Sequence, residues 1–300
     1  DPKADEGFPA ALPSPELGWI FPADTTGTFR SSGRNTPLAT NAWGLRSGAV
    51  SEADTIRLLI LGDSYAFGWG VEAEDSFGAT LGRELGVEVV NGAIPGYSIY
   101  QQVRMFDYVT ARTDVDAVVA TISLANDAID EERIRRYAPD RLAEFDYGLR
   151  DPRSFSAKMI RASRILTLLD ERTNHIQFGL KNARGPGGDM AVDSLYDLAE
   201  RCHERGLPLV WLVVPRAGEV RGGGMMSGIL NRQTARLRGH FLQVTADYGS
   251  PGLGLLPVLT EAQQGGESYL PHDAHWNERG HRAVAEAVLP VLKEAWATPQ

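Results

Sequence analysis

Short runs of aliphatic residues recur along the chain after residue 55, and turn-forming or polar residues bound each of them. These runs predict β-strands at 57–62, 86–90, 116–123 and 208–214, with a weaker candidate within 253–259. Nearly continuous aliphatic runs are typical of strands that are buried on both faces of a parallel sheet.

Segments with apolar residues at helical spacing lie between these runs. They predict helices at about 75–85, 98–112, 191–205, 226–247 and 278–296. Strands that alternate with amphipathic helices predict an α/β fold, in which right-handed crossovers build a mostly parallel sheet covered on both faces.

Two segments depart from this alternation. Residues 1–50 are rich in Pro, Gly, Ser and Thr, yet they carry Phe8, Trp19, Phe21, Phe29 and Trp43, so we expect an extended arm that packs on the core. The main domain then spans 51–300. Within it, the charged segment at about 128–190 predicts a helical insertion that leaves from the end of the third strand and can overhang that edge of the sheet.

The composition suits one globular domain with a sizeable core, since 43% of the 300 residues are hydrophobic and 23% are charged. The net charge of -9 and the lack of a basic cluster argue against nucleic-acid binding. The longest apolar runs reach about half of the roughly 20 residues that span a bilayer, so no transmembrane segment is expected. The single cysteine, Cys202, excludes an intrachain disulfide, and its helical spacing from Leu195, Leu198 and Ala199 predicts an inert core thiol.

The sequence begins at Asp1 rather than at an initiator methionine, which predicts an upstream segment such as a signal peptide or membrane anchor. We therefore expect an extracytoplasmic location: periplasmic, secreted or membrane-anchored. A single cysteine is compatible with an oxidising compartment without demonstrating one, and a cytoplasmic location stays open.

The first strand ends abruptly in Gly-Asp-Ser within LLILGDSYAFGW, residues 58–69. Open α/β folds bind their ligands at the carboxyl ends of the strands, and Gly62 allows a tight turn there. This placement predicts that Ser64 is a nucleophile. The simpler structural alternative is that Asp63 or Ser64 only caps the following helix.

Two further segments follow the second and third strands and offer hydrogen-bond donors to an oxyanion. In NGAIPGYS, residues 91–98, a Pro95-Gly96 turn can leave the N–H of Gly96 pointing out beside the sheet edge. In ISLANDAID, residues 122–130, Asn126 has an amide donor that stays neutral at every working pH. Each segment by itself is more typical of an ordinary turn or cap.

The segment PHDAHWNERGH, residues 271–281, supplies candidates for the remaining groups. A serine hydroxyl is a weak nucleophile, so it needs an imidazole that takes its proton and a carboxylate that orients the imidazole. His275 and Asp273 would supply both, whereas His281 is expected at the surface or in the first turn of the last helix. A His-Asp-x-His cluster also suits a metal, but no second such cluster stands out, and we predict neither metal nor cofactor.

Taken together, these blocks resemble those of the SGNH hydrolase superfamily, also called GDSL esterases and lipases. Gly-Asp-Ser, Gly96, Asn126-Asp127, and Asp273 with His275 carry the likeness, which covers about 56–127 and 268–296. The resemblance implies a flavodoxin-like three-layer α/β/α sandwich with a mostly parallel five-stranded sheet.

The resemblance also implies a role for each residue. Ser64 would attack an ester carbonyl, with His275 as general base and then general acid, oriented by Asp273. The N–H groups of Ser64 and Gly96 and the side chain of Asn126 would form the oxyanion hole.

Two positions depart from the usual family pattern. Leu124 stands two residues before Asn126, where glycine is usual, and Asp273 precedes His275 by two residues rather than three. The resulting DAHW form is similar to that of the alginate O-acetyltransferase-like branch, which points to acyl groups on polysaccharide. The arm segment NAWGLRS, residues 41–47, is also similar to that of bacterial SGNH proteins.

We therefore expect a serine esterase that hydrolyses short-chain acyl esters, acetyl esters above all, of a small molecule or a glycan through an acyl-enzyme on Ser64. O-acyl transfer to a glycan and a non-catalytic glycan-binding domain stay open as alternatives. Trp69 and Trp276 lie close to the predicted catalytic residues in sequence and are weak candidates for substrate binding, with core packing as the alternative.

Overall fold

The computed structural model describes residues 11–31, 34–124, 127–138, 140–144 and 187–222, and then 235, 238–239, 241–243, 245–247 and 249–297.

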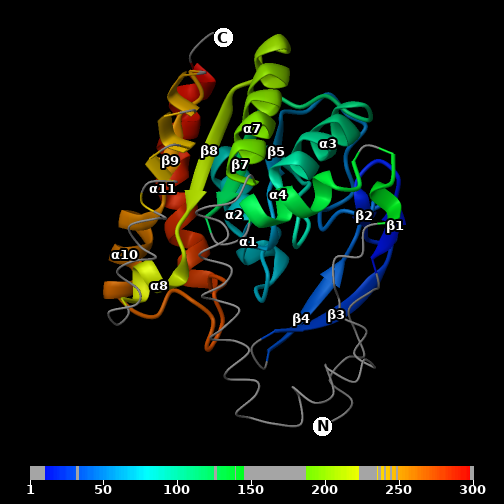
Figure 1. The fold of residues 1–300 in the computed structure, drawn as a ribbon. Coiled ribbons are helices and arrows are strands. Elements are labelled where there is room, and N and C mark those ends of the chain that lie inside the picture. Colours follow the sequence, from blue (N-terminus) through cyan, green and yellow to red (C-terminus); the bar gives the residue numbers. More distant parts are fainter. Residues whose placement is uncertain are drawn as a thin grey trace, which may run out of the picture.

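Five parallel strands form the central sheet (Figure 1). Along the sheet they are β6 (Glu88–Asn91), β5 (Arg57–Leu61), β7 (Ala117–Ser123), β8 (Leu209–Val214) and β9 (Gly252–Gly254). Every neighbouring pair is parallel. Numbered along the chain, this order is 2-1-3-4-5, the flavodoxin-like order that places the switch point between β5 and β7. The predicted fold is confirmed.

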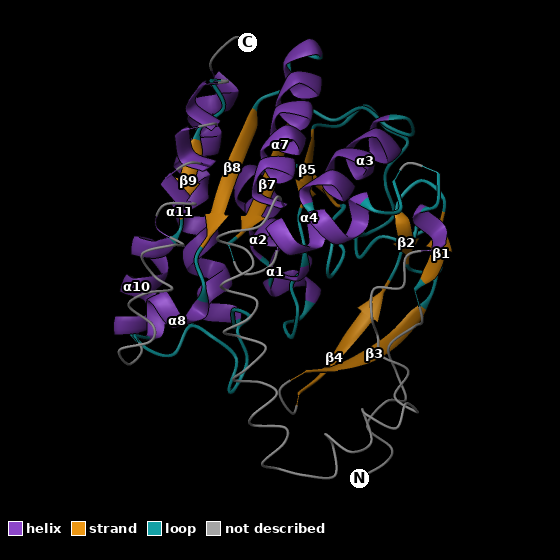
Figure 2. Ribbon diagram, viewed as in Figure 1, coloured by secondary structure: helices purple, strands orange, loops and turns teal. Residues whose placement is uncertain are grey.

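Helices cover both faces of the sheet, so the molecule has three layers (Figure 2). One face carries α3 (Ile99–Thr110), α4 (Asp127–Arg135) and α7 (Gly187–Glu204), which pack on one another. The other carries α2 (Phe77–Leu85), α10 (Leu256–Gln264) and α11 (Glu278–Ala297). Shorter helical turns are α1 (Ser64–Phe67), η1 (Ala73–Asp75), η2 (Leu142–Glu144) and α8 (Ala217–Arg221). The strands β5, β7 and β8 are buried throughout, as their aliphatic runs predict.

The weaker fifth strand predicted within 253–259 is present as β9, but it covers only the start of that range. Strand β9 ends at Gly254, and helix α10 begins at Leu256 with a proline in its first turn. Pro257 favours this start because its fixed φ suits a helix and its missing N–H would have no partner there. The predicted helix at 226–247 and most of the proposed insertion at 128–190 lie outside the described residues.

The arm consists of two antiparallel hairpins, β1 (Leu12–Ser14) with β2 (Gly18–Ile20), and β3 (Thr26–Ser31) with β4 (Arg34–Ala39). Trp19, Phe21 and Phe29 are buried against the main domain, and Trp43 is half-buried. The ring of Trp19 lies 5.1 Å from that of Tyr97, and the ring of Phe29 lies 6.1 Å from that of Phe67. Phe8 lies outside the described residues. Hydrophobic burial therefore holds the described part of the arm against the core.

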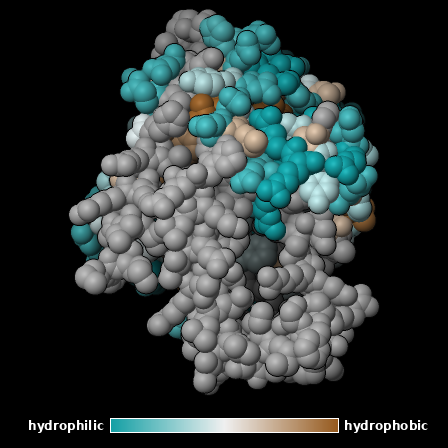
Figure 3. All heavy atoms as spheres, in the orientation of Figure 1, coloured by the Kyte–Doolittle hydropathy of each residue, from teal (hydrophilic) through white to brown (hydrophobic). Residues whose placement is uncertain are grey.

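The described part of the surface is mainly hydrophilic on the face that Figure 3 shows. Among the described helices, none is both long and apolar enough to cross a bilayer. Cys202 is buried in the core, and burial raises the pKa of its thiol to about 12, which suits an unreactive packing residue.

Candidate active site

The junction of β5 and α1 brings Ser64 to the carboxyl end of the sheet as the first residue of α1. Asp63 is the helix cap, because its Oδ1 accepts a hydrogen bond from the N–H of Tyr65 at 2.9 Å. Gly62 has no room for a side chain: a Cβ there would lie 2.1 Å from Thr121 Oγ1 and 2.6 Å from Ala66 Cβ. Capping therefore falls to Asp63, and the hydroxyl of Ser64 stays available for a different contact.

Three of the sequence-predicted residues lie in one hydrogen-bonded row. Ser64 Oγ lies 2.7 Å from His275 Nε2, although the two residues are 211 positions apart. His275 Nδ1 lies 2.6 Å from Asp273 Oδ1. Because a carboxylate only accepts hydrogen bonds, Nδ1 carries the proton, and the lone pair of Nε2 faces the serine hydroxyl.

The short spacing between Asp273 and His275 is accommodated by a local turn. Asp273 Oδ1 also accepts the backbone N–H of His275 at 3.0 Å, the arrangement of an Asx turn. One carboxylate oxygen thus accepts hydrogen bonds from both the backbone N–H and the ring Nδ1–H of His275. Two residues are therefore enough to bring the carboxylate onto the imidazole.

The segment after β6 forms the predicted tight turn beside the nucleophile. Tyr97 N–H donates to Ile94 O at 3.1 Å, and Gly96 has φ +83°, so Pro95 and Gly96 occupy the two central positions of a type II turn. Ile94 N–H donates to Gly62 O at 3.2 Å, which ties the turn to the β5–α1 junction. Within the described residues, neither Ser64 N–H nor Gly96 N–H donates to another protein group.

Asn126 lies outside the described residues. The described neighbour Asp127 begins α4 and accepts the N–H of Ser123 at 2.7 Å, so it closes the turn between β7 and α4. The pKa of the Asp127 carboxyl is raised well above its usual range. Burial is the main cause, and repulsion from the nearby Asp63 carboxylate is the second.

The two tryptophans have different environments. Trp69 is half-buried, and its ring lies 5.7 Å from that of His275 and 4.9 Å from that of Phe29 of the arm. Trp276 is fully buried, with ring contacts to Tyr65 and His281 among others. The candidate role of Trp276 in substrate binding is therefore wrong, because core packing leaves none of its surface for a ligand.

Tyr65 and Arg221 touch the histidine segment but do not emerge from the sequence analysis. The hydroxyl of Tyr65 donates to Ala274 O at 3.0 Å, and its ring lies 5.0 Å from that of His275. Burial raises the pKa of Tyr65 well above 10, so the hydroxyl keeps its proton. Arg221 Nη1 donates to Asp273 O at 2.9 Å. The only signal for Tyr65 is its position after the nucleophile, and Arg221 has no local signal because its partners lie about 50 residues away.

The sequence predicts His281 at the surface or in the first turn of the last helix. It lies in the first turn of α11 and is buried rather than at the surface. Its Nδ1 accepts the N–H of Phe77 at 3.3 Å, and burial lowers the pKa of the ring to about 3. Among the described residues, no three His, Cys, Asp or Glu side chains gather into a group that could hold a metal ion.

Known structures of similar shape were found. A protein of the lipolytic G-D-S-L family from Desulfitobacterium hafniense is 14% identical, with a TM-score of 0.49 over 78% of this chain and 98% of that one. The acetyl xylan esterase AlAXEase is 15% identical, with a TM-score of 0.47 over 79% and 99% of the two chains. TesA is 16% identical, with a TM-score of 0.48 over 80% of this chain and 99% of that one.

No curated protein sequence matches the chain. The family model of the GDSL-like lipases and acylhydrolases matches residues 60–283, well over half of the 300 residues. That match covers the Gly-Asp-Ser junction, the Gly96 turn and the histidine segment described above. This chain belongs to the GDSL-like lipase/acylhydrolase family.

Proposed function

We propose that this protein is a serine esterase that hydrolyses short-chain acyl esters, acetyl esters above all, through an acyl-enzyme on Ser64. The observation that carries the proposal is the row of hydrogen bonds from Ser64 through His275 to Asp273. It joins a nucleophile, a base and an orienting carboxylate at the end of the sheet where α/β folds bind ligands.

In the first half-reaction, Ser64 Oγ attacks the carbonyl carbon while His275 Nε2 takes its proton. The imidazolium that forms is stabilised by Asp273, whose Oδ1 accepts a hydrogen bond from Nδ1–H with an N···O distance of 2.6 Å. The same proton then passes to the leaving alcohol as the ester C–O bond breaks. In the second half-reaction, His275 activates a water molecule that attacks the acyl carbon and releases the carboxylic acid and Ser64.

The negative charge of the tetrahedral intermediate needs fixed donors. We assign this role to the N–H groups of Ser64 and Gly96, which donate to no other group of the described protein, and to the side chain of Asn126. Each such donor is worth about 3 to 4 kcal/mol in comparable oxyanion holes.

We further propose that the acyl group is carried on a carbohydrate, outside the cytoplasm. The support for a carbohydrate is Trp69, a half-buried indole 5.7 Å from the ring of His275, since aromatic faces offer sugars a flat apolar surface. The Asp-x-His-Trp form of the histidine segment points in the same direction.

Replacement of the nucleophile tests the proposal. The parent protein should hydrolyse p-nitrophenyl acetate faster than the butyrate and octanoate esters and should be labelled by a fluorophosphonate. Ser64→Ala should lose labelling and nearly all hydrolysis, because no other hydroxyl faces His275 Nε2 in the described residues. Ser51→Ala, at an exposed serine, is the matched control and should behave as the parent.

Hydrolysis by Ser64→Ala at the parent rate would overturn the assignment. An unlabelled parent would instead indicate a non-catalytic binding domain. Accumulation of an acetylated sugar when an acceptor glycan is added would identify an acyltransferase.

A further inference from the structure

The carboxylate of the proposed triad is carried on a strained turn. Asp273 N–H donates to Leu270 O at 3.2 Å, which closes a four-residue turn with Pro271 and His272 at its centre. His272 has φ +56°, in the left-handed region that favours glycine. A non-glycine residue rarely adopts this conformation, so contacts from outside the turn must maintain it.

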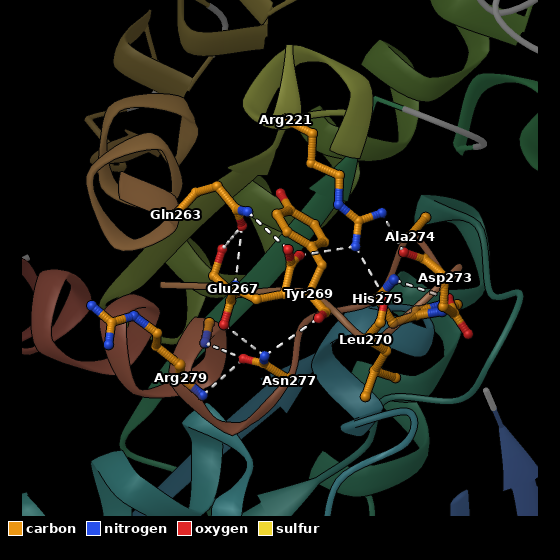
Figure 4. A network of polar contacts seen from close by, with 12 residues as sticks. Arg221, Gln263, Glu267, Tyr269, Leu270, Asp273, Ala274, His275, Asn277 and Arg279 are labelled. Atoms are coloured by element: carbon orange, nitrogen blue, oxygen red, sulfur yellow. Dashed lines mark hydrogen bonds and ion pairs between the residues drawn. The ribbon is translucent and has the colours of Figure 1, made fainter. Parts of the chain in front are cut away.

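Arg221, the last residue of α8, bridges the two ends of this turn (Figure 4). Its Nη1 donates to Asp273 O at 2.9 Å, and its Nη2 donates to Leu270 O at 3.0 Å. A guanidinium group presents its donors in a rigid plane, so one side chain fixes the distance between the two carbonyl groups. A single-point donor cannot do the same.

The guanidinium group is itself held in place. Arg221 Nη2 also donates to Glu267 Oε1 at 3.1 Å, and the Arg221 Cζ atom lies 4.8 Å from the centre of the Tyr269 ring. Arg221 thus approaches the turn with its orientation already set by an ion pair and an aromatic face.

The carbonyl group of Ala274, the next residue, is held by helix α1. The Tyr65 hydroxyl, on the nucleophile helix α1, donates to Ala274 O. The main chain between Asp273 and His275 is therefore anchored at two successive carbonyl groups, one by α8 and one by α1. This matters because Asp273 Oδ1 serves both donors of His275, so a movement of the turn disturbs both contacts.

We propose that Arg221 is a positioning residue, which holds the turn so that Asp273 stays on Nδ1 of His275 and the imidazole stays aimed at Ser64. This inference rests on the proposed esterase function. Arg221 acts through the main chain of Asp273, and its removal should lower the rate of the chemical step more than substrate binding.

Two substitutions separate the bridging geometry from the charge. Arg221→Lys keeps a cation but loses the planar pair of donors, and Arg221→Gln removes the charge and the guanidinium group. Arg279→Gln is the matched control, because Arg279 belongs to the same network but its side chain donates to Ala262 O rather than to the turn (Figure 4).

Two measurements are made on each protein. The first is the low-field proton NMR resonance of His275 Nδ1–H, which reports the hydrogen bond to Asp273 directly and does not require activity. The second is kcat and KM for p-nitrophenyl acetate, expressed per serine labelled by a fluorophosphonate, so that unfolded protein does not count.

We expect both Arg221 variants to lose the resonance or shift it upfield. Their kcat should fall about ten- to a hundredfold with little change in KM, since a misplacement of about 1 Å can cost about a hundredfold in rate. Arg279→Gln should match the parent in both measurements.

Parent-like resonance and kcat in Arg221→Gln would overturn the proposal, because the bridge would then be dispensable. A parent that neither hydrolyses esters nor is labelled would overturn the proposed function instead. In that case the resonance still decides whether Arg221 holds Asp273 against His275.

Discussion

Two histidines six residues apart in one segment have opposite environments. The side chain of His275 is 22% exposed and joins a carboxylate to a hydroxyl. His281 is enclosed by aromatic rings and accepts a hydrogen bond from the main chain of α2, so it must stay neutral. The same residue type thus joins a hydrogen-bonded row at one position and makes a packing contact at the other, where burial makes a charge costly.

This difference predicts how stability depends on pH. The pKa of His281 is about 3 when folded against about 6.5 when unfolded, so between these values the unfolded chain binds the extra proton. The free energy of unfolding should therefore fall as pH drops from 6.5 towards 3, with His281 contributing about 1.4 kcal/mol per pH unit. Urea unfolding at pH 7, 6, 5 and 4 measures the slope.

His281→Asn keeps an acceptor for Phe77 N–H but cannot be protonated, so its unfolding free energy should fall less steeply with decreasing pH. His203→Asn, at an exposed position of α7, should keep the parent slope. Parallel curves for the parent and His281→Asn would contradict the prediction.

At the scale of elements, the position of Ser64 depends on how closely the junction of β5 and α1 approaches β7. The approach is possible because Gly62 has no side chain between Thr121 and Ala66. Gly62, directly after β5, also provides the carbonyl oxygen that accepts the N–H of Ile94. The segment of Ser64 and the Gly96 turn of the proposed site therefore share one glycine. The absence of a side chain at position 62 is therefore needed both for packing and for the proposed site.

Gly62→Ala should therefore reduce both stability and activity. The added methyl group would overlap Thr121 Oγ1 at 2.1 Å, and overpacking of this kind costs about 1 to 3 kcal/mol. We expect lower urea stability and a large loss of kcat per labelled serine.

Gly86→Ala is the matched control, because Gly86 caps α2 with φ +68° but has no atom within 4 Å of the added Cβ. It should lose about 1 kcal/mol of stability and keep the parent kcat. Parent-like turnover in Gly62→Ala would show that the close approach does not position Ser64.

At the scale of the whole molecule, the arm is part of the architecture around the site. Arg46 is buried, and its guanidinium group donates to Phe67 O, Gly68 O and Val71 O, next to Trp69, and to Pro37 O of β4. It also lies over the ring of Phe29, which packs on Trp69. One side chain thus connects the arm hairpin to the segment that follows the nucleophile helix.

Arg46→Met should destabilise the protein by more than about 2 kcal/mol, because it leaves several buried carbonyl groups without donors. It should also raise KM, since the segment that carries Trp69 loses its anchor. Thermal unfolding and steady-state kinetics measure the two effects.

Arg34→Gln provides the comparison within the same arm. Arg34 pairs with Glu278 at the surface, and exposed ion pairs contribute about 0 to 1 kcal/mol, so this variant should remain close to the parent. Equal losses of stability in the two variants would mean that the buried contacts of Arg46 carry no special weight.

The local pattern of the sequence determined the strands β5, β6, β7 and β8 and the helices α2, α3, α7 and α11. It also determined the segments that carry Ser64, Gly96 and His275. These features follow from side-chain periodicity and from local steric rules, such as the Pro95-Gly96 turn. The segment around Pro257 shows the limit of such prediction. Periodicity in a short apolar run does not distinguish a strand from a helix.

Only the tertiary structure decided which residues meet. Ser64 and His275 lie 211 positions apart, and the Arg221 bridge, the Tyr65 contact and the burial of Trp276 and His281 all depend on elements distant in sequence. Burial and orientation arise when the layers pack, so they have no signature in local periodicity. The sequence by itself therefore identified the candidate reacting groups, whereas the packing of α1, α8 and the arm decided what holds them.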